Sequence, residues 1–430
     1  MRGRGVWLDS GRIIINTGEQ LYEDGRPVSK IDTQYHYLRT KEIPYRVGNP
    51  FSDDEMQQLL SVFGSLSIKG KQGFLYVSAW VIQAQIFAVL PWRFHVWISG
   101  DRGSGKSTLQ SWIGDLIIRP SLNLNSSAAG IRQDIQSDTI PVIYDESEPD
   151  NERLKEIIEL ARATNSNNGF DTKRGTPSGK AIVYNTQTCF CMGSIQKGFD
   201  KSADISRFFV VEMAKAEQTI EEYENMVARI QHFTKNKERL FARAVENAPT
   251  ILRSFKVSQR FFREKRIESR LADQLASLVS CFWLYFSTQT ITEPQLEYLV
   301  REFDLLKSEY IESNEMNDAQ ECYDAIMTMK VDNMNNSVFQ CINEIQHAAS
   351  GIVADQWEKI LGAMGMRYYP AKKELLIANK SAEIQKRLPA FSDYASILRR
   401  DKGLFVREDR QRITNYHQNP RAVVIKVTLQ

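Results

Sequence analysis

A phosphate-binding loop is the sequence feature that most constrains how this chain can fold. An apolar segment at residues 96–99 leads into the complete pattern Gly-x-x-x-x-Gly-Lys-Ser at residues 100–107. Glycines let the backbone curl so that successive N–H groups point at phosphate oxygens, and the helix that follows directs its positive dipole end at the same charge. The pattern therefore predicts a strand, a loop and a helix of an α/β fold that binds a nucleoside triphosphate.

Individual residues of this loop have separate expected roles. Lys106 is expected to reach the β- and γ-phosphates of ATP, and the Ser107 hydroxyl to ligate Mg²⁺. A chance glycine-rich turn is the alternative, but apolar residues after the loop recur with the period of a helix, which favours phosphate binding. The expected nucleotide contacts are Gly100, Gly103, Ser104, Gly105, Lys106, Ser107 and Thr108.

Length and composition indicate an ordinary soluble protein with more than one domain. The chain has 430 residues, enough for roughly two to four domains with buried cores. Its formal net charge of +2 is nearly balanced, so a nucleic-acid surface has to be a local patch. Five scattered cysteines predict neither a disulfide framework nor a paired-cysteine zinc site, which favours a reducing, cytoplasmic location.

The longest apolar run, residues 74–90, is predicted to be a core helix and not a membrane span. Ser78, Gln83 and Gln85 interrupt it, and its 17 residues lie at the lower limit of what can cross a bilayer. The basic N-terminus passes directly into strand-type sequence, so no cleavable signal is expected. We therefore expect no membrane association.

Periodicity and turn residues divide the chain into four expected regions. Residues 1–50 have the pattern of a small antiparallel β element, and residues 51–215 alternate strands with helices, which predicts a parallel sheet covered by helices on both faces. Residues 216–330 are predicted to be a helical lid and residues 331–430 a winged-helix-like domain. A hairpin is expected at about residues 169–185.

Two acidic residues follow a buried strand, 39 residues after Lys106. Asp145 is placed to hold the Mg²⁺ shell, and Glu146 beside it to polarise a water for in-line attack on the γ-phosphoryl group. A phosphate-transferring kinase does not need the second acid at this point, so the pair favours hydrolysis. The alternative is an acidic strand end that caps the next helix.

Three later residues are further candidates for contact with the nucleotide. Ser194 ends a strand expected beside the phosphate loop and is the best candidate to sense the γ-phosphate or hold the attacking water; a simple strand-end turn stays open. Arg207, just before an apolar strand, is expected to act as an arginine finger on a neighbouring subunit of a ring, unless it is a solvated surface charge. Arg270 is the candidate lid sensor.

Basic residues at two places suggest contact with nucleic acid. Lys173, Arg174 and Lys180 lie around the tip of the expected hairpin, where they can follow a phosphate backbone without reading bases. Residues 399–430 hold eight basic and three acidic side chains. This second patch fits DNA, an acidic partner or a solvated face, and the sequence leaves these open.

Together these segments resemble the AAA+ helicase module of phage, plasmid and integrative-element primase-helicases, close to the superfamily 3 helicases. The resemblance is carried by the opening RGRGVWLDSGRIIINTG, by HVWISGDRGSGKST, by SSAAGIRQDIQSDTIPVIYDESE, by KRGTPSGKAIVY, by ADISRFFVV and by the late NKSAEIQKRL and ILRR. The basic hairpin before the Ser194 strand is its most specific part. The resemblance implies a P-loop AAA+ core and a hexameric ring that threads single-stranded DNA, driven by ATP hydrolysis at subunit interfaces.

The sequence departs from that family in two respects. Relatives often carry a primase or zinc-binding domain upstream, so this chain is expected either to be a fragment or to work with a separate primase. Asparagine is the commoner sensor in AAA+ proteins, where this chain has Ser194. The alternative function is an ATP-switched loader or defence-system assembly protein without unwinding activity.

Overall fold

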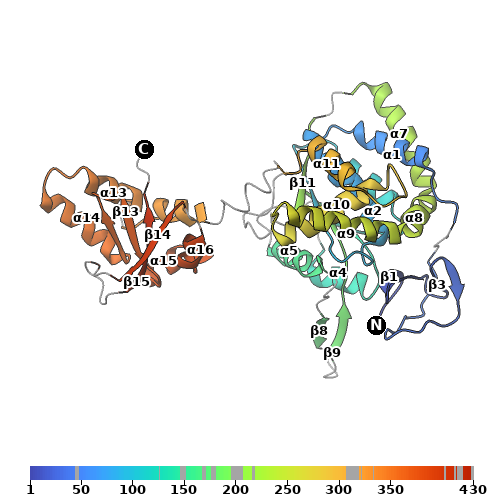
Figure 1. Cartoon of the computed structure of the whole chain (residues 1–430), viewed down its shortest axis with the longest axis horizontal. Coiled ribbons are helices and arrows are strands. Elements are labelled where there is room, and N and C mark those ends of the chain that lie inside the picture. The colour runs from blue at the N-terminus through green and yellow to red at the C-terminus, as the bar shows by residue number, and fades with distance from the viewer. Residues whose placement is uncertain are drawn as a thin grey trace. The chain divides into compact units, whose positions relative to one another are not determined.

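The computed structural model divides into two compact units, Met1–Leu306 and Lys307–Gln430, and each is described here by itself. Figure 1 labels their helices and strands. For residues 171–175 and 181–185 only the backbone is described. The described residues are 1–43, 48–124, 126–145, 152–166, 171–175, 181–194, 207–215, 218–306, 319–320, 322–332, 334–400, 403–410, 413 and 420–427.

A four-stranded antiparallel meander begins the first unit, as the alternating pattern predicts. Its strands are β1 (Gly5–Asp9), β2 (Arg12–Asn16), β3 (Leu21–Glu23) and β4 (Arg26–Val28), paired in that order.

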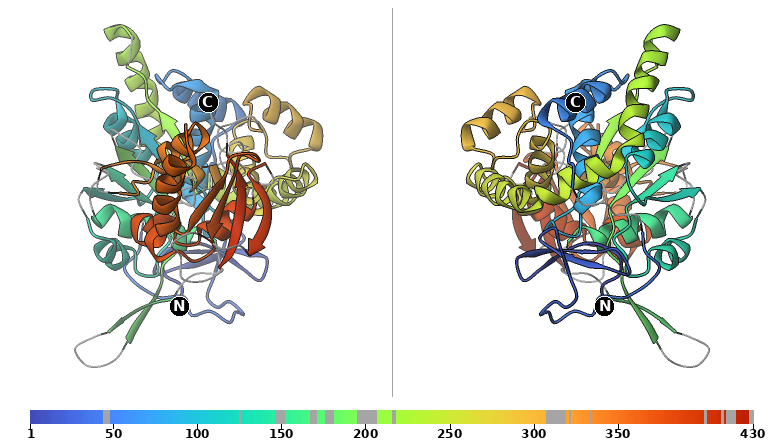
Figure 2. Two further views of the ribbon diagram at one scale, coloured as in Figure 1. Left: turned by 90° about the vertical axis from the view of Figure 1, so that its left-hand side faces the viewer. Right: turned by 90° about the vertical axis from the view of Figure 1, so that its right-hand side faces the viewer.

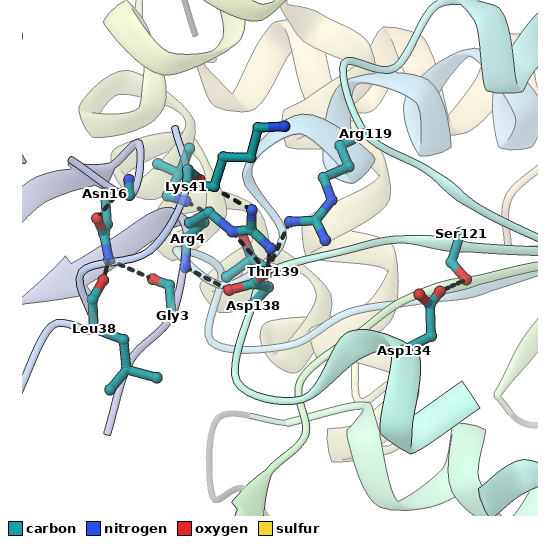
Figure 3. Close-up of polar contacts among 12 residues, drawn as sticks. Gly3, Arg4, Asn16, Leu38, Lys41, Arg119, Ser121, Asp134, Asp138 and Thr139 are labelled. Atoms are coloured by element: carbon teal, nitrogen blue, oxygen red, sulfur yellow. Dashed lines mark hydrogen bonds and ion pairs between the residues drawn. The ribbon is translucent and has the colours of Figure 1, made fainter. Parts of the chain in front are cut away.

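The meander is attached to the segment that precedes the acidic strand of the main sheet. Asp138 accepts hydrogen bonds from the backbone N–H of Arg4 at 2.6 Å and from the guanidinium groups of Arg4 and Arg119, each at 2.7 Å, as Figure 3 shows. Gly5 has a φ of 128°, and a Cβ there would lie 2.7 Å from Cβ of Thr139. The two glycines of the opening Arg-Gly-Arg-Gly therefore allow close backbone approach, while Arg4 supplies the ion pair.

Two helices precede the main sheet. A capping box at Ser52 and Glu55 begins α1 (Asp53–Gly64). The apolar run forms α2 (Gly70–Ile86), which is buried almost all round. Gln83 is accommodated because its side-chain amide pairs with both backbone polar groups of Phe94. In the described part of the chain, no helix has the length and apolar character needed to cross a membrane.

Five parallel strands form the main sheet, in the order β11-β5-β10-β7-β6. The phosphate-loop strand β5 therefore lies beside β10, and β10 separates it from the acidic strand β7. This arrangement confirms the predicted α/β fold with a parallel sheet. The strands are β5 (His95–Ser99), β6 (Ser121–Leu124), β7 (Val142–Asp145), β10 (Phe190–Ser194) and β11 (Phe208–Glu212).

Helices cover both faces of this sheet. On one face lie α2 and α3 (Lys106–Asp115). On the other face α4 (Ala128–Ile135) and α5 (Glu152–Thr164) pack on a cluster that includes Trp97. After α5 the chain makes an antiparallel hairpin of β8 (Asp171–Gly175) and β9 (Ala181–Asn185), which projects away from the sheet in Figures 1 and 2.

Five helices complete the described part of the first unit, and two of them, α8 and α10, pack on α2. Ser277 Oγ donates to the carbonyl of Trp92 at 2.7 Å, and the Tyr285 hydroxyl donates to the carbonyl of Ser78 at 3.1 Å. The unit boundary at Leu306 falls inside the region 216–330 that the sequence suggests as one helical segment. The helices are α7 (Ile220–Lys235), α8 (Lys237–Glu246), α9 (Ala248–Glu264), α10 (Ser269–Trp283) and α11 (Glu293–Glu302).

The second unit packs short helices on a four-stranded antiparallel sheet, β12-β13-β15-β14. Two helices are followed directly by the hairpin β12–β13, and the winged-helix-like nature of residues 331–430 stays a prediction. The last two strands of the chain are β14 and β15, and β15 is an inner strand of the sheet. Its elements are α13 (Val338–Gln346), α14 (Gly351–Ala363), β12 (Met366–Tyr369), β13 (Glu374–Ala378), α15 (Ala382–Arg387), η1 (Pro389–Phe391), α16 (Tyr394–Arg400), β14 (Phe405–Arg410) and β15 (Arg421–Lys426).

Candidate nucleotide site

The backbone of the phosphate loop has the left-handed conformations that its glycines permit. Gly103 and Gly105 have φ values of 77° and 87°, and Gly105, the N-cap of α3, makes no side-chain capping hydrogen bond. Gly100 has a φ of 153°, and a Cβ there would lie 2.8 Å from both the Met213 carbonyl oxygen and Ser104 Oγ. The N-terminus of α3 is therefore open, as an anion site requires.

The side chains of the loop divide between its surface and its interior. Lys106 Nζ donates to the carbonyl oxygens of Gly100 at 2.6 Å and Asp101 at 2.8 Å, so the ammonium lies over the loop. Ser107 is exposed on the first turn of α3, and Thr108 is half-buried. Ser104 is buried, and its hydroxyl has no hydrogen-bond partner among the described residues.

The carboxyl ends of three neighbouring strands meet beside this loop. Ser194, the last residue of β10, is in register with Ser99 of β5. One strand further, Tyr144 of β7 pairs with Met192, so Asp145 ends β7 close to the same level. The strand order thus brings Asp145 and Ser194 to the edge of the sheet from which the phosphate loop begins. Glu146 lies outside the described residues.

The tip of β10 has a hydrogen-bonded neighbour on one face and a close neighbour on the other. Trp97 Nε1 donates to Ser194 Oγ at 2.9 Å, and both side chains are buried. Gln110 of α3 packs over Gly193 on the opposite face and donates from Nε2 to the Tyr144 carbonyl at 3.2 Å. Neither Trp97 nor Gln110 was identified as a site residue from the sequence. For Gln110 a signal was available, because it is a glutamine one turn after Lys106 on the buried face of α3.

A hollow adjoins the loop on the side of α7. Segment 65–67, which joins α1 to α2, lies against the end of β11 because the N–H of Ala214 donates to the Ser67 carbonyl at 2.7 Å. The hollow has a volume of about 70 Å³ and opens near a wider, more polar groove of about 530 Å³ along α7. Its apolar lining includes Leu66, Met213, Tyr223 and Met226. No local sequence pattern indicates this lining, because its residues come from the segment after α1, the end of β11 and α7.

The structure does not bring Arg207 to its own phosphate loop. The Arg207 carbonyl accepts the N–H of His95 at the start of β5, whereas Glu212, at the other end of β11, pairs with Ser99. These five residues of parallel strand span about 16 Å. Arg207 therefore lies at the sheet end opposite the nucleotide edge.

Arg270 lies in the first turn of α10. No hydrogen bond or ion pair connects it to the phosphate loop within the part of the chain that the structure describes. The helix itself packs on α2 and α9.

The basic hairpin is described only in its backbone. Lys173 and Arg174 of β8 pair with Val183 and Ile182 of β9, and Lys180 lies outside the described residues.

A buried histidine lies where β5 begins, at the end of the strand opposite the phosphate loop. His95 accepts the N–H of Phe190 at Nδ1, at 3.1 Å, and donates from Nε2 to the carbonyl of Ala161 at 2.8 Å. Burial lowers the pKa of His95 to about 4, so the ring is neutral at physiological pH. It connects β5, β10 and α5 without carrying charge.

Comparison with known proteins gives support for the fold. No family model and no curated protein sequence matches the chain. A solved structure described as SCCmec type IV Cch, an active helicase, is 12% identical, with a TM-score of 0.53 over 99% of this chain and 79% of the other. The apo C-terminal region of NrS-1 is 13% identical over 98% of this chain and 96% of the other, with a TM-score of only 0.35. The first of these shows that the chain shares the fold of a P-loop core with additional domains.

Proposed function

We propose that this chain is an ATP-hydrolysing DNA helicase or translocase that acts as an oligomeric ring, in the replication system of a phage or mobile element. The observation that carries the proposal is the insertion of β10 between β5 and β7. It brings the end of β10, with Ser194, between the phosphate loop and Asp145, where attack on the γ-phosphate takes place. A structure that shares this fold is described as an active helicase, which supports the choice of reaction.

The donor groups at the sheet edge fit a magnesium nucleotide. Lys106 and the open N-terminus of α3 match the charge of the phosphates, and the hydroxyl of Ser107 with the carboxylate of Asp145 supplies the oxygen ligands that Mg²⁺ prefers. When bound there, Mg²⁺ would neutralise the negative charge that develops on the phosphates. Glu146 then orients and deprotonates the attacking water. The hollow beside α7 has the apolar lining and the position to take the nucleobase.

The position of Arg207 supports a site shared between subunits. About 16 Å of strand separates Arg207 from the phosphate-loop edge of its own sheet, so we assign its charge to the nucleotide of a neighbouring subunit. A closed ring, proposed to be a hexamer, places one subunit's Arg207 at the next subunit's γ-phosphate.

The hairpin β8–β9 is the proposed DNA contact. It projects from the unit that holds the nucleotide site, and Lys173, Arg174 and Lys180 give it positive charge at or near its tip. Contacts of this kind follow the phosphate backbone and depend strongly on salt.

A comparison of ATP hydrolysis with and without single-stranded DNA, followed by unwinding of a forked duplex, tests this function. We expect DNA to stimulate hydrolysis and Lys106→Ala to abolish it, while Lys155→Ala on the exposed face of α5 leaves it unchanged. Glu146→Gln should keep nucleotide binding and stop turnover. If the rate of hydrolysis does not change when DNA is added, and the double variant Lys173→Ala/Arg174→Ala binds DNA as well as the wild type does, the loader or assembly protein is favoured instead.

A further inference from the structure

The hydrogen bond between Trp97 and Ser194 occupies one acceptor position of the serine hydroxyl. An indole N–H can only donate, so Ser194 Oγ is the acceptor in this 2.9 Å bond. This bond does not use the hydroxyl proton of Ser194, which can donate to a nucleotide or a water. A donor is the group required at this strand end, because a γ-phosphate oxygen can only accept.

Trp97 is itself fixed in place. Its ring is fully buried among the α4 and α5 side chains of one apolar cluster, and it lies edge-on against Phe208 with ring centres 5.6 Å apart. A bond from such a ring holds the Ser194 side chain in one orientation, with little entropy left to lose when the nucleotide binds.

Gln110 holds the same strand tip from the opposite face of the sheet. A Cβ on Gly193 would lie 2.8 Å from Cδ and from Nε2 of Gln110, closer than side chains approach one another. The same glutamine donates to the carbonyl of Tyr144, the residue before Asp145. Gln110 is on α3, one turn after Lys106, so it connects the phosphate-loop helix with both β10 and β7.

We propose that Trp97 and Gln110 are positioning residues for ATP hydrolysis. Trp97 orients Ser194 as a hydrogen-bond donor to the γ-phosphate or the attacking water, and Gln110 sets the spacing of β10 and Asp145 relative to the phosphate loop. This inference rests on the proposed function. It also gives a physical reason why serine can occupy the place where asparagine is commoner, since the indole supplies the orientation that a short side chain lacks.

A double-mutant cycle tests the role of Trp97. Trp97→Phe keeps the ring and removes the donor, and we expect it to lower kcat about tenfold, the loss of one oriented hydrogen bond. Ser194→Ala should lower kcat at least as much. Because Trp97 acts through Ser194, adding Trp97→Phe to Ser194→Ala should lower kcat no further, and KM for ATP should stay within about twofold in each variant.

Trp7→Phe is the matched control, because Trp7 is also buried and donates its indole N–H, at 3.0 Å to the carbonyl of Gly3 in the N-terminal sheet. It should lose a similar amount of thermal stability with kcat unchanged. If Trp7→Phe lowers kcat as much as Trp97→Phe does, the effect of Trp97 is structural and the proposal is wrong. The proposal is also wrong if the losses from Trp97→Phe and Ser194→Ala are additive.

A suppressor pair tests the role of Gln110. Gly193→Ala should lower kcat because its methyl group collides with Gln110, and Gln110→Ala should restore part of that activity in the double variant. A double variant no more active than Gly193→Ala would contradict the spacing role. Wild-type protein without Lys106-dependent hydrolysis would overturn the proposed function itself, whereas normal hydrolysis in Trp97→Phe would overturn only the positioning role.

Discussion

Asp138 is the residue through which the N-terminal sheet is attached to the nucleotide-binding core. It lies in the turn between α4 and β7, and its side chain faces two guanidinium groups, those of Arg4 and Arg119, at 2.7 Å each (Figure 3). Removal of one carboxylate therefore leaves two partly buried cations without their partner.

We expect Asp138→Asn to lower the free energy of unfolding by about 1 to 3 kcal/mol, since the amide keeps the shape but loses the charge. Urea unfolding followed by circular dichroism measures this. Asp115→Asn, at an exposed position at the end of α3, is the control and should change stability by less than about 0.5 kcal/mol. Equal stability of the two variants would show that the ion pairs contribute nothing net.

His95 predicts how stability depends on pH. Its pKa in the folded protein is about 4, below the ordinary value of 6.5, so the folded state excludes a proton that the unfolded chain binds. The stability contributed by the neutral ring is complete above pH 6.5 and is lost as the pH falls toward 4. At pH 4.5 the loss should be about 2 to 3 kcal/mol.

Comparison of wild-type protein with His95→Gln isolates this contribution from other acid-sensitive groups. The stability advantage of the wild type should be largest at pH 7 and shrink between pH 6.5 and 4.5. An advantage that stays constant over this range would mean that folding does not lower the pKa of His95.

Single residues also show where sequence reasoning reached its limit. The loop glycines and the apolar strand before them predicted β5, the phosphate loop and α3, because that pattern is local. Trp97 and Gln110 contact Ser194 and Gly193, about 90 residues later in the chain, and no local pattern contains such a contact. Glu146 and Lys180 stay predictions, since they lie outside the described residues.

At the scale of elements, the sequence pattern predicted best those helices and strands that are buried on every side. The apolar run at residues 74–90 is a helix, displaced to Gly70–Ile86, with Lys69 as its N-cap and Phe87 as its C-cap. The strands β12 and β13 were not predicted, because Pro370 and two lysines interrupt a short alternating pattern. The pairing of β13 with β15, nearly 50 residues later, stabilises what the local sequence only weakly favours.

The contact between the N-terminal sheet and the core makes a prediction for β1. Gly5→Ala places a methyl group against Thr139 at a φ of 128°, so we expect the sheet to detach locally, with faster amide hydrogen exchange in β1 and β2. Gly11→Asn is the control, because Gly11 has open space around it and a φ of 82° that asparagine tolerates. Unchanged exchange in Gly5→Ala would show that the close approach is not required.

At the scale of the whole molecule, the first unit contains the phosphate loop, Asp145, Ser194 and Arg207, yet the last of these lies at the wrong end of the sheet for its own nucleotide. The proposed function therefore needs two copies of the chain for one complete site. Neither the order of motifs nor the composition contains this information. The direction of β11 relative to β5 shows only that Arg207 and the phosphate loop lie at opposite ends of the sheet.

Mixing two inactive variants tests this central claim most directly. Lys106→Ala lacks a working phosphate loop and Arg207→Ala lacks the arginine, so each protein alone should hydrolyse ATP at a small fraction of the wild-type rate. In an equal mixture that assembles at random, about one quarter of the subunit interfaces should combine an intact loop with an intact Arg207, and a comparable share of wild-type hydrolysis should return. Full activity of Arg207→Ala alone, or a mixture no more active than its components, would contradict the shared site.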